Sequence, residues 1–137
     1  MHFKKITIIR TEISRNAGVN EQIQLFGGSL GLFNPRDKDK SCYRIFITLL
    51  RNLKKEELSS DEIADKTGLT RGTVVHHLNR LMDADIVINY RKKYILNVDN
   101  IQELIKRIKK NVNKTLDDLD EVAKNLDERL GLEWFLN

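Results

Sequence analysis

The stretch that decides the fold runs from Ser59 to Val98 and reads SSDEIADKTGLTRGTVVHHLNRLMDADIVINYRKKYILNV. It opens with hydroxyl side chains followed by Asp61 and Glu62, which is the pattern that starts a helix, and Gly68 is a residue type that commonly ends one. Thr70 can then cap a further helix that continues to about position 84. The apolar residues of that helix recur at helical spacing, at Val74, Leu78, Leu81 and Met82. The sequence therefore predicts two helices joined by a tight turn.

Two β-prone runs follow these helices, Ile86–Tyr90 and Tyr94–Val98. They are separated by Arg91, Lys92 and Lys93, so the simplest interpretation is a hairpin with a basic tip. Two helices that meet at a turn containing glycine and are followed by a β-hairpin make a helix-turn-helix with a wing.

The residues before this stretch predict one more helix and a β-prone extension. Apolar residues at helical spacing between Cys42 and Leu53 indicate a helix with one buried stripe. Further upstream, Phe3–Ile13 is rich in β-branched residues, and Ile23–Phe26 is a candidate hairpin partner for it. We treat residues 1–35 as an N-terminal extension that covers the last helix, extends the sheet or joins a dimer interface, and we favour the last of these.

The end of the chain predicts a long helix with a heptad seam. Asp99 or Asn100 can cap it and Gly131 can end it, which gives roughly 30 residues and a length of about 45 Å. Its apolar positions alternate steps of four and three: Ile101, Ile105, Ile108, Val112, Thr115, Leu119, Val122 and Leu126. A second copy of the chain is the commonest cover for such a stripe, so we expect residues 99–137 to dimerise as a coiled coil. The alternative is packing on the N-terminal strands of the same chain.

Length and charge agree with a small domain that has a basic middle region. The chain has 137 residues, which allows one compact domain with an extension, and a formal net charge of +4. The excess lies in the middle, because residues 36–98 hold 13 basic against 9 acidic side chains while residues 99–137 hold 7 against 9. Such a domain suits a polyanionic partner.

Several functional classes find no support in the sequence. The single cysteine, Cys42, cannot form an internal disulfide or a cluster of zinc ligands, and the adjacent His76 and His77 diverge on a helix. The segment Gly27–Ser29 lacks the Lys-Ser/Thr ending of a phosphate loop, and no His-Glu-x-x-His or nucleophile with a nearby base occurs. We expect no enzymatic activity, no cofactor and no metal. With no run of 18 apolar residues and no signal peptide, we expect a cytoplasmic protein that does not enter membranes.

Residues 40–98 resemble the winged helix-turn-helix regulators of bacteria and archaea, in particular the ArsR-like and MarR-like groups. The resemblance rests on Ile63-Ala64 through Gly68-Leu69-Thr70, on the run Thr73–Leu81, and on Ile86-Val87. Where many members have glycine before the first wing strand, this chain has Asp85. The fold expected is mainly α with a small β component, and the recognition helix is expected at about 70–84.

The resemblance implies a homodimer that binds double-stranded DNA in a sequence-specific manner. It places the recognition helix in the major groove and the wing on the backbone or in the minor groove. The implied contacts are Thr70 and Arg71 to phosphate, Thr73, His76 and Arg80 to base edges or nearby phosphates, and Arg91, Lys92 and Lys93 from the wing tip. From its own position on the helix, next to Leu78 and one turn from Val74 and Leu81, His77 is expected to be partly buried and to pack rather than to bind a ligand. The rival interpretations are a winged-helix protein–protein module and a nucleic-acid-binding protein without sequence preference.

Overall fold

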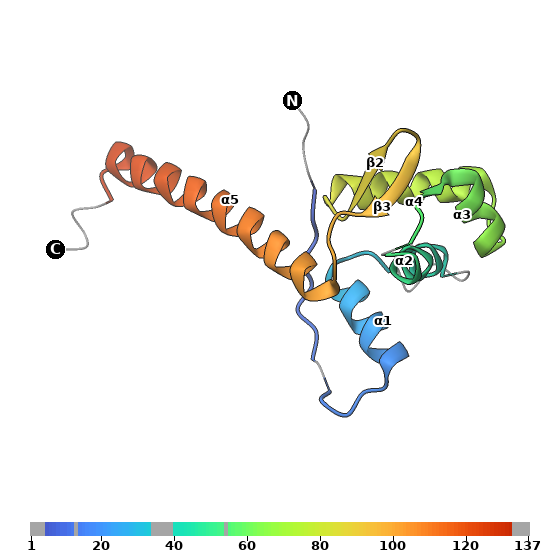
Figure 1. Ribbon diagram of the computed structural model, residues 1–137. Helices are drawn as coiled ribbons and strands as arrows, with labels where there is room; N and C mark the ends of the chain where they lie inside the picture. The colour runs from blue at the N-terminus through green and yellow to red at the C-terminus, as the bar shows by residue number, and fades with distance from the viewer. Residues whose placement is uncertain (1–4, 13, 34–39, 54, 133–137) are drawn as a thin grey trace. The chain divides into compact units, whose positions relative to one another are not determined.

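The described residues form five helices and three short strands. The computed structural model describes residues 5–12, 14–33, 40–53 and 55–132. The elements, in chain order, are α1 (Val19–Ser29), α2 (Ser41–Arg51), β1 (Leu58–Ser59), α3 (Ser60–Thr67), α4 (Arg71–Asp83), β2 (Val87–Tyr90), β3 (Lys93–Leu96) and α5 (Ile101–Leu130) (Figure 1). The chain divides into two compact units, Met1–Asp99 and Asn100–Asn137.

The first unit contains a winged helix-turn-helix, so the predicted fold class is confirmed. Helices α2, α3 and α4 pack on one another, and β2 and β3 form an antiparallel hairpin that packs on α4. Strand β1 pairs with the other edge of β3, so the strand order is β1-β3-β2. The residues at the centre of this unit have no exposed surface: Ile45, Phe46, Ile63, Val74, Leu78, Leu81 and Ile86. Each such side chain contributes about 1.5–3 kcal/mol by burial, and together they fix the orientation of α4.

Caps define the helix ends that the sequence predicted. The Ser59 hydroxyl accepts a hydrogen bond from the Glu62 N–H at 3.1 Å, and the Glu62 carboxylate accepts one from the Ser59 N–H at 3.2 Å. This capping box starts α3. The side chain of Asn100 caps α5, which ends at Gly131 in the left-handed conformation.

The predicted N-terminal hairpin is wrong. The segment Ile23–Phe26 belongs to helix α1, and residues 5–12 form no strand. Apolar residues at 19, 23, 26 and 30 follow a helical period, and tertiary packing rewards the helix. Phe26 stacks on Phe46 of α2 at a centroid distance of 6.1 Å. A Cβ at Gly27 would collide with the Phe33 ring, so only glycine lets that ring approach the helix.

The segment before α1 is extended and joins two helix ends. The Lys5 N–H donates to the Asp83 carbonyl at the end of α4 at 3.1 Å. The Ile9 N–H donates to the Ser29 carbonyl at the end of α1 at 2.7 Å. Among the described residues the sheet contains only β1, β2 and β3, so this segment does not extend it.

The wing turn is shorter than predicted. Tyr90 pairs with Lys93, so Lys93 is the first residue of β3 and the turn consists of Arg91 and Lys92 alone. Both have positive φ, 53° and 65°. These angles are those of a two-residue turn whose twist matches that of the flanking strands. Asp85, before the first wing strand, also adopts a left-handed φ of 61°.

Candidate nucleic-acid interface

Helix α4 has one buried face and one polar exposed face. Val74, Leu78 and Leu81 are fully buried, and they hold the helix against α2, α3 and β2. The exposed face carries no carboxylate between Arg71 and Met82. Its exposed residues are Arg71, Gly72, His76, Asn79 and Arg80, with Thr73 and Val75 half-buried beside them.

The turn before α4 is held by side-chain hydrogen bonds. Gly68 has φ of 71°, a conformation that favours glycine. The Thr67 hydroxyl donates to the Ile63 carbonyl at 2.7 Å and accepts from the Leu69 N–H at 3.3 Å. The guanidinium of Arg44 on α2 donates to the Thr67 carbonyl. Arg44 therefore ties α2 to the turn, a role that no local sequence pattern could have revealed.

The N-terminus of α4 is exposed and free of acidic residues in its first turn. Thr70 caps it, since its hydroxyl accepts from the Thr73 N–H at 3.2 Å and donates to the Thr73 hydroxyl at 2.8 Å. The positive end of the helix dipole and the remaining N–H groups can attract an anion here. Arg71 forms an ion pair with Asp61 of α3 at 3.5 Å, and both side chains are more than 70% exposed. Such an exposed pair is weak and can open to meet phosphate.

Gly72 belongs to the same helical turn and is a residue that the sequence pattern did not single out. A Cβ built at Gly72 meets nothing within 4 Å, so no contact inside the chain requires glycine there. Glycine within a helix costs about 0.5–1 kcal/mol relative to alanine. The absence of a side chain at this exposed position leaves room for another molecule to approach the backbone.

Further along α4, the two histidines and Arg80 have different environments. His76 is exposed, whereas His77 is only 8% exposed, which confirms that His77 packs in the interior. Their rings meet edge to face at a centroid distance of 5.2 Å. Arg80 is exposed, and its Nη2 donates to the Gly31 carbonyl at 3.2 Å. That bond uses one of the five donors of its guanidinium.

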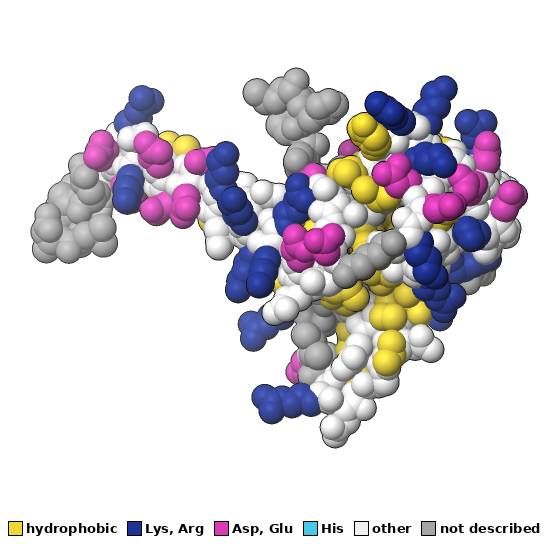
Figure 2. Space-filling model, in the orientation of Figure 1, with side chains coloured by type: hydrophobic (Ala, Val, Ile, Leu, Met, Phe, Trp, Pro, Cys, Tyr) yellow, Lys and Arg dark blue, Asp and Glu magenta, His cyan; other side chains and the backbone are white. Residues whose placement is uncertain are grey.

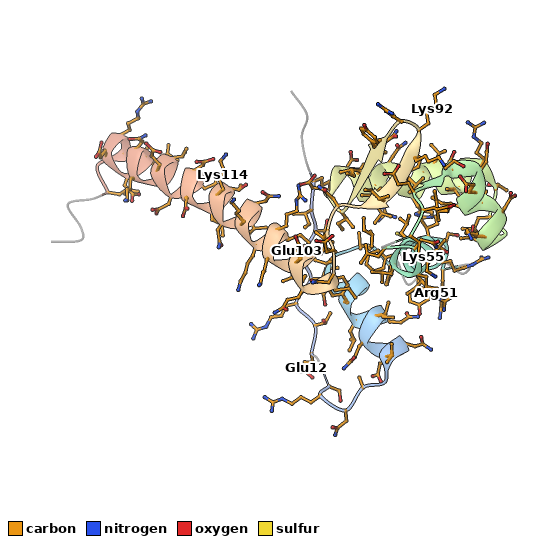
Figure 3. The ribbon with its side chains drawn as sticks, viewed as in Figure 1. Glu12, Arg51, Lys55, Lys92, Glu103 and Lys114 are labelled. Carbon is orange, nitrogen blue, oxygen red and sulfur yellow. The ribbon has the colours of Figure 1, made fainter. Side chains whose placement is uncertain are left out.

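The wing presents its cations in two ways. Arg91 and Lys92 are exposed at the turn, and Lys92 projects from its tip (Figure 3). The Arg91 guanidinium lies 5.2 Å from the centroid of the Tyr90 ring. Lys93 instead pairs with Glu62 of α3 at 3.8 Å. The hydrogen bonds from the backbone and side chain of Ser59 lower the pKa of Glu62, and Lys93 and Lys66 lower it further.

A comparison with protein families identifies the type of this domain. Residues 47–89 match the model of the bacterial regulatory proteins of the arsR family. These residues are therefore similar to the helix-turn-helix domain of that family. The match runs from α2 to β2. The wing turn and α5 lie outside the matched residues.

The chain is also similar to a solved structure. The crystal structure of ligand-free NadR matches with 23% sequence identity and a TM-score of 0.39, over 88% of this chain and 91% of that one. None of the curated proteins matches the chain.

The winged helix-turn-helix carries the predicted contact residues on α4 and on the wing. Thr70 caps α4, Arg71, Thr73 and His76 lie on its first two turns, and Arg80 lies about 13 Å from Arg71 along the helix axis. Lys93 lies near the start of α3 through its pair with Glu62. Within residues 5–12, 14–33, 40–53 and 55–132, no cluster of three His, Cys, Asp or Glu side chains is arranged to hold a metal ion. No helix in the same ranges has the length and apolar character needed to cross a membrane.

Proposed function

We propose that the protein is a transcriptional regulator that binds double-stranded DNA in a sequence-specific manner as a homodimer. The observation that carries the proposal is the exposed face of α4, which has basic and polar side chains and no carboxylate over the twelve residues from Arg71 to Met82. A protein–protein module would be expected to expose apolar side chains on this face instead.

The proposed contacts divide by chemistry. Thr70 and Arg71 bind phosphate at the helix N-terminus, where backbone N–H groups add to the guanidinium. Thr73, His76 and Arg80 contact base edges in the major groove or the phosphates beside them. The wing residues Arg91, Lys92 and Lys93 supply attraction that does not depend on sequence.

The proposed dimer forms through α5. Five apolar side chains of its second half are each at least 50% exposed, an unusual stripe for a helix that stands alone: Leu116, Leu119, Val122, Leu126 and Leu130. The predicted seam residues Ile101 and Ile105 are also exposed, Val112 is half-buried, and Ile108 is buried. A two-fold dimer presents two recognition helices about 34 Å apart, which requires half-sites about 10 base pairs between centres.

A selection from random duplexes tests the proposal. The full-length protein is incubated with a library of random 30-mers, and the bound fraction is amplified and sequenced over several rounds. We expect enrichment of a pseudo-palindrome with the spacing given above, and a variant His76→Ala should select a site relaxed at one base pair of each half. Recovery of DNA without any enriched sequence would replace specific recognition with general nucleic-acid binding. No retention of DNA would favour the protein–protein module.

A further inference from the structure

Helix α5 carries opposite charges on its two halves. Residues 101–115 contain five basic side chains against one acidic, whereas residues 116–130 contain six acidic against two basic. Figure 2 shows the Lys and Arg side chains gathered over the half that starts at Ile101 and the Asp and Glu side chains over the half that ends at Leu130. The polarity runs against the helix dipole, which favours acidic residues near the N-terminus, so the dipole does not explain it.

The charges flank the exposed apolar stripe on both sides. At 3.6 residues per turn, the apolar residues of α5 fall within one third of the circumference. One flank of the stripe carries Lys106, Lys109, Asp120 and Asp127, and the other carries Arg107, Lys114, Asp118 and Glu121. On the first flank the sign changes from positive to negative at the middle of the helix, apart from Lys124 in the acidic half. The second flank also carries Glu103 in the basic half and Arg129 in the acidic half, so its sign is mixed. Any helix that covers the stripe therefore meets both charge blocks.

A second copy of α5 complements this pattern in only one orientation. In a parallel pair, each basic half would face a basic half and each acidic half an acidic half, which is repulsive along the whole length. In an antiparallel pair, the basic half of each helix faces the acidic half of the other. The intrahelical pair of Lys124 with Asp120, at 3.8 Å, neutralises little of the acidic block.

We propose that the exposed stripe of α5 binds the α5 stripe of a second copy in antiparallel orientation, with the two charge blocks setting that orientation. The inference rests on the proposed homodimer and adds the direction of pairing. Attraction between opposite blocks is screened by salt, so the dimer dissociates more readily as the salt concentration rises. A parallel dimer would show the opposite dependence, because salt would screen its repulsion.

Spin labels along one flank of α5 test the orientation. Three single-cysteine variants, Asn111→Cys, Asp118→Cys and Asn125→Cys, place labels seven residues apart on the same side of the helix. Cys42 is 2% exposed, and labelled wild-type protein reports any reaction there. In an antiparallel pair, moving the label by seven residues moves it about 10.5 Å along each helix in opposite directions. Two sites that lie on the same side of the two-fold axis therefore differ by about 21 Å in the distance between the two labels of the dimer.

The three distances separate the possible outcomes. An antiparallel dimer cannot give the same separation at all three sites, whereas a parallel dimer in register gives one short separation throughout. Equal separations therefore overturn the orientation while leaving the homodimer intact. Sedimentation showing monomers at micromolar concentration, together with no dipolar coupling, overturns the homodimer and the orientation with it.

A charge exchange provides an independent test. Replacing Asp117, Asp118, Asp120 and Glu121 by Lys makes both halves of α5 basic, and we expect the dimer dissociation constant to rise at least about tenfold. Adding Lys106→Glu, Arg107→Glu, Lys109→Glu and Lys110→Glu exchanges the blocks and should restore wild-type dimerisation. In a parallel dimer, the four substitutions by Lys would replace repulsion between acidic halves with repulsion between basic halves. An unchanged dissociation constant of this variant therefore contradicts the proposal.

Discussion

At the scale of single residues, the exposed N-terminal end of α4 consists of residues that do not pack in the core. Arg71 forms a weak, exposed ion pair with Asp61, and Thr70 caps the first turn. Gly72 follows Arg71 in the same turn, and a Cβ at this position would meet nothing within 4 Å. This combination leaves the backbone of the first turn accessible to a partner.

The substitution Gly72→Ala separates stability from binding. Because alanine is the better helix former, we expect the free energy of unfolding to rise by up to about 1 kcal/mol. If DNA approaches the backbone here, the added methyl group should lower DNA affinity about tenfold or more. Gly28→Ala in α1 is the matched control, since its Cβ also meets nothing within 4 Å, and it should leave DNA binding unchanged. Chemical denaturation and a binding titration measure the two effects. Wild-type affinity in Gly72→Ala would exclude close backbone approach.

At the scale of elements, the capping box of α3 links pH to stability. Hydrogen bonds from Ser59 lower the pKa of Glu62 below its ordinary value of 4.5. At a pH above the pKa that Glu62 has in the unfolded chain, its carboxylate therefore stabilises the folded state. This stabilisation is lost as the pH falls through the lower pKa that Glu62 has in the folded chain. We expect Glu62→Gln to be less stable than wild type at about pH 6 and the difference to shrink towards about pH 3.

Urea unfolding at several pH values measures that difference. Asp65→Asn, on the same helix but outside the capping box, is the control for the loss of one charge. If the difference in the free energy of unfolding between wild type and Glu62→Gln stays constant down to about pH 3, the stabilising role of the Glu62 carboxylate is contradicted.

The cations of the wing are expected to contribute unequally to the salt dependence of DNA binding. Arg91, Lys92 and Lys93 are all exposed, but Lys93 also forms an ion pair with Glu62. Replacing Arg91 and Lys92 by Ala should weaken binding to all duplexes similarly and reduce the slope of log K against log salt by about 0.9 for each phosphate that the variant no longer neutralises. Lys93→Ala should change the slope less. The double variant Arg10→Ala, Arg15→Ala is the control outside the proposed interface, and an unaltered slope in the wing variant would remove the wing from DNA binding.

Elements that depend on local patterns were predictable from the sequence, and those that depend on distant contacts were not. The caps at Ser59, Thr70 and Asn100 are local, so the starts of α3, α4 and α5 were predicted correctly. Helix α1 was missed because the short apolar run Ile23–Phe26 suggested a strand, while packing of Phe26 on Phe46 favours the helix. Strand β1 has only two residues, too few for a sequence period. Likewise, the role of Arg44 depends on a partner 23 residues away.

At the scale of the whole molecule, dimerisation is part of the proposed reading of DNA. Leu119 is 56% exposed, so Leu119→Asp should leave the fold of each chain intact and place a charge in the stripe that the second copy covers. We expect monomers in sedimentation at micromolar concentration and a loss of specific DNA binding of about a hundredfold or more. Leu119→Met, which keeps the apolar surface, should behave as wild type. A Leu119→Asp protein that still dimerises and binds its site would contradict the assignment of α5.

The most direct test of the central claim compares two duplexes that differ only in sequence. The protein is titrated with the selected site and with a shuffled duplex of the same composition, at 50 and 200 mM salt. The account predicts that the selected site binds at least about a thousandfold more tightly at both concentrations. It also predicts that binding to both duplexes weakens steeply with salt, by about a thousandfold if six phosphates are contacted per dimer. Equal affinity for the two duplexes would contradict sequence-specific recognition by this domain.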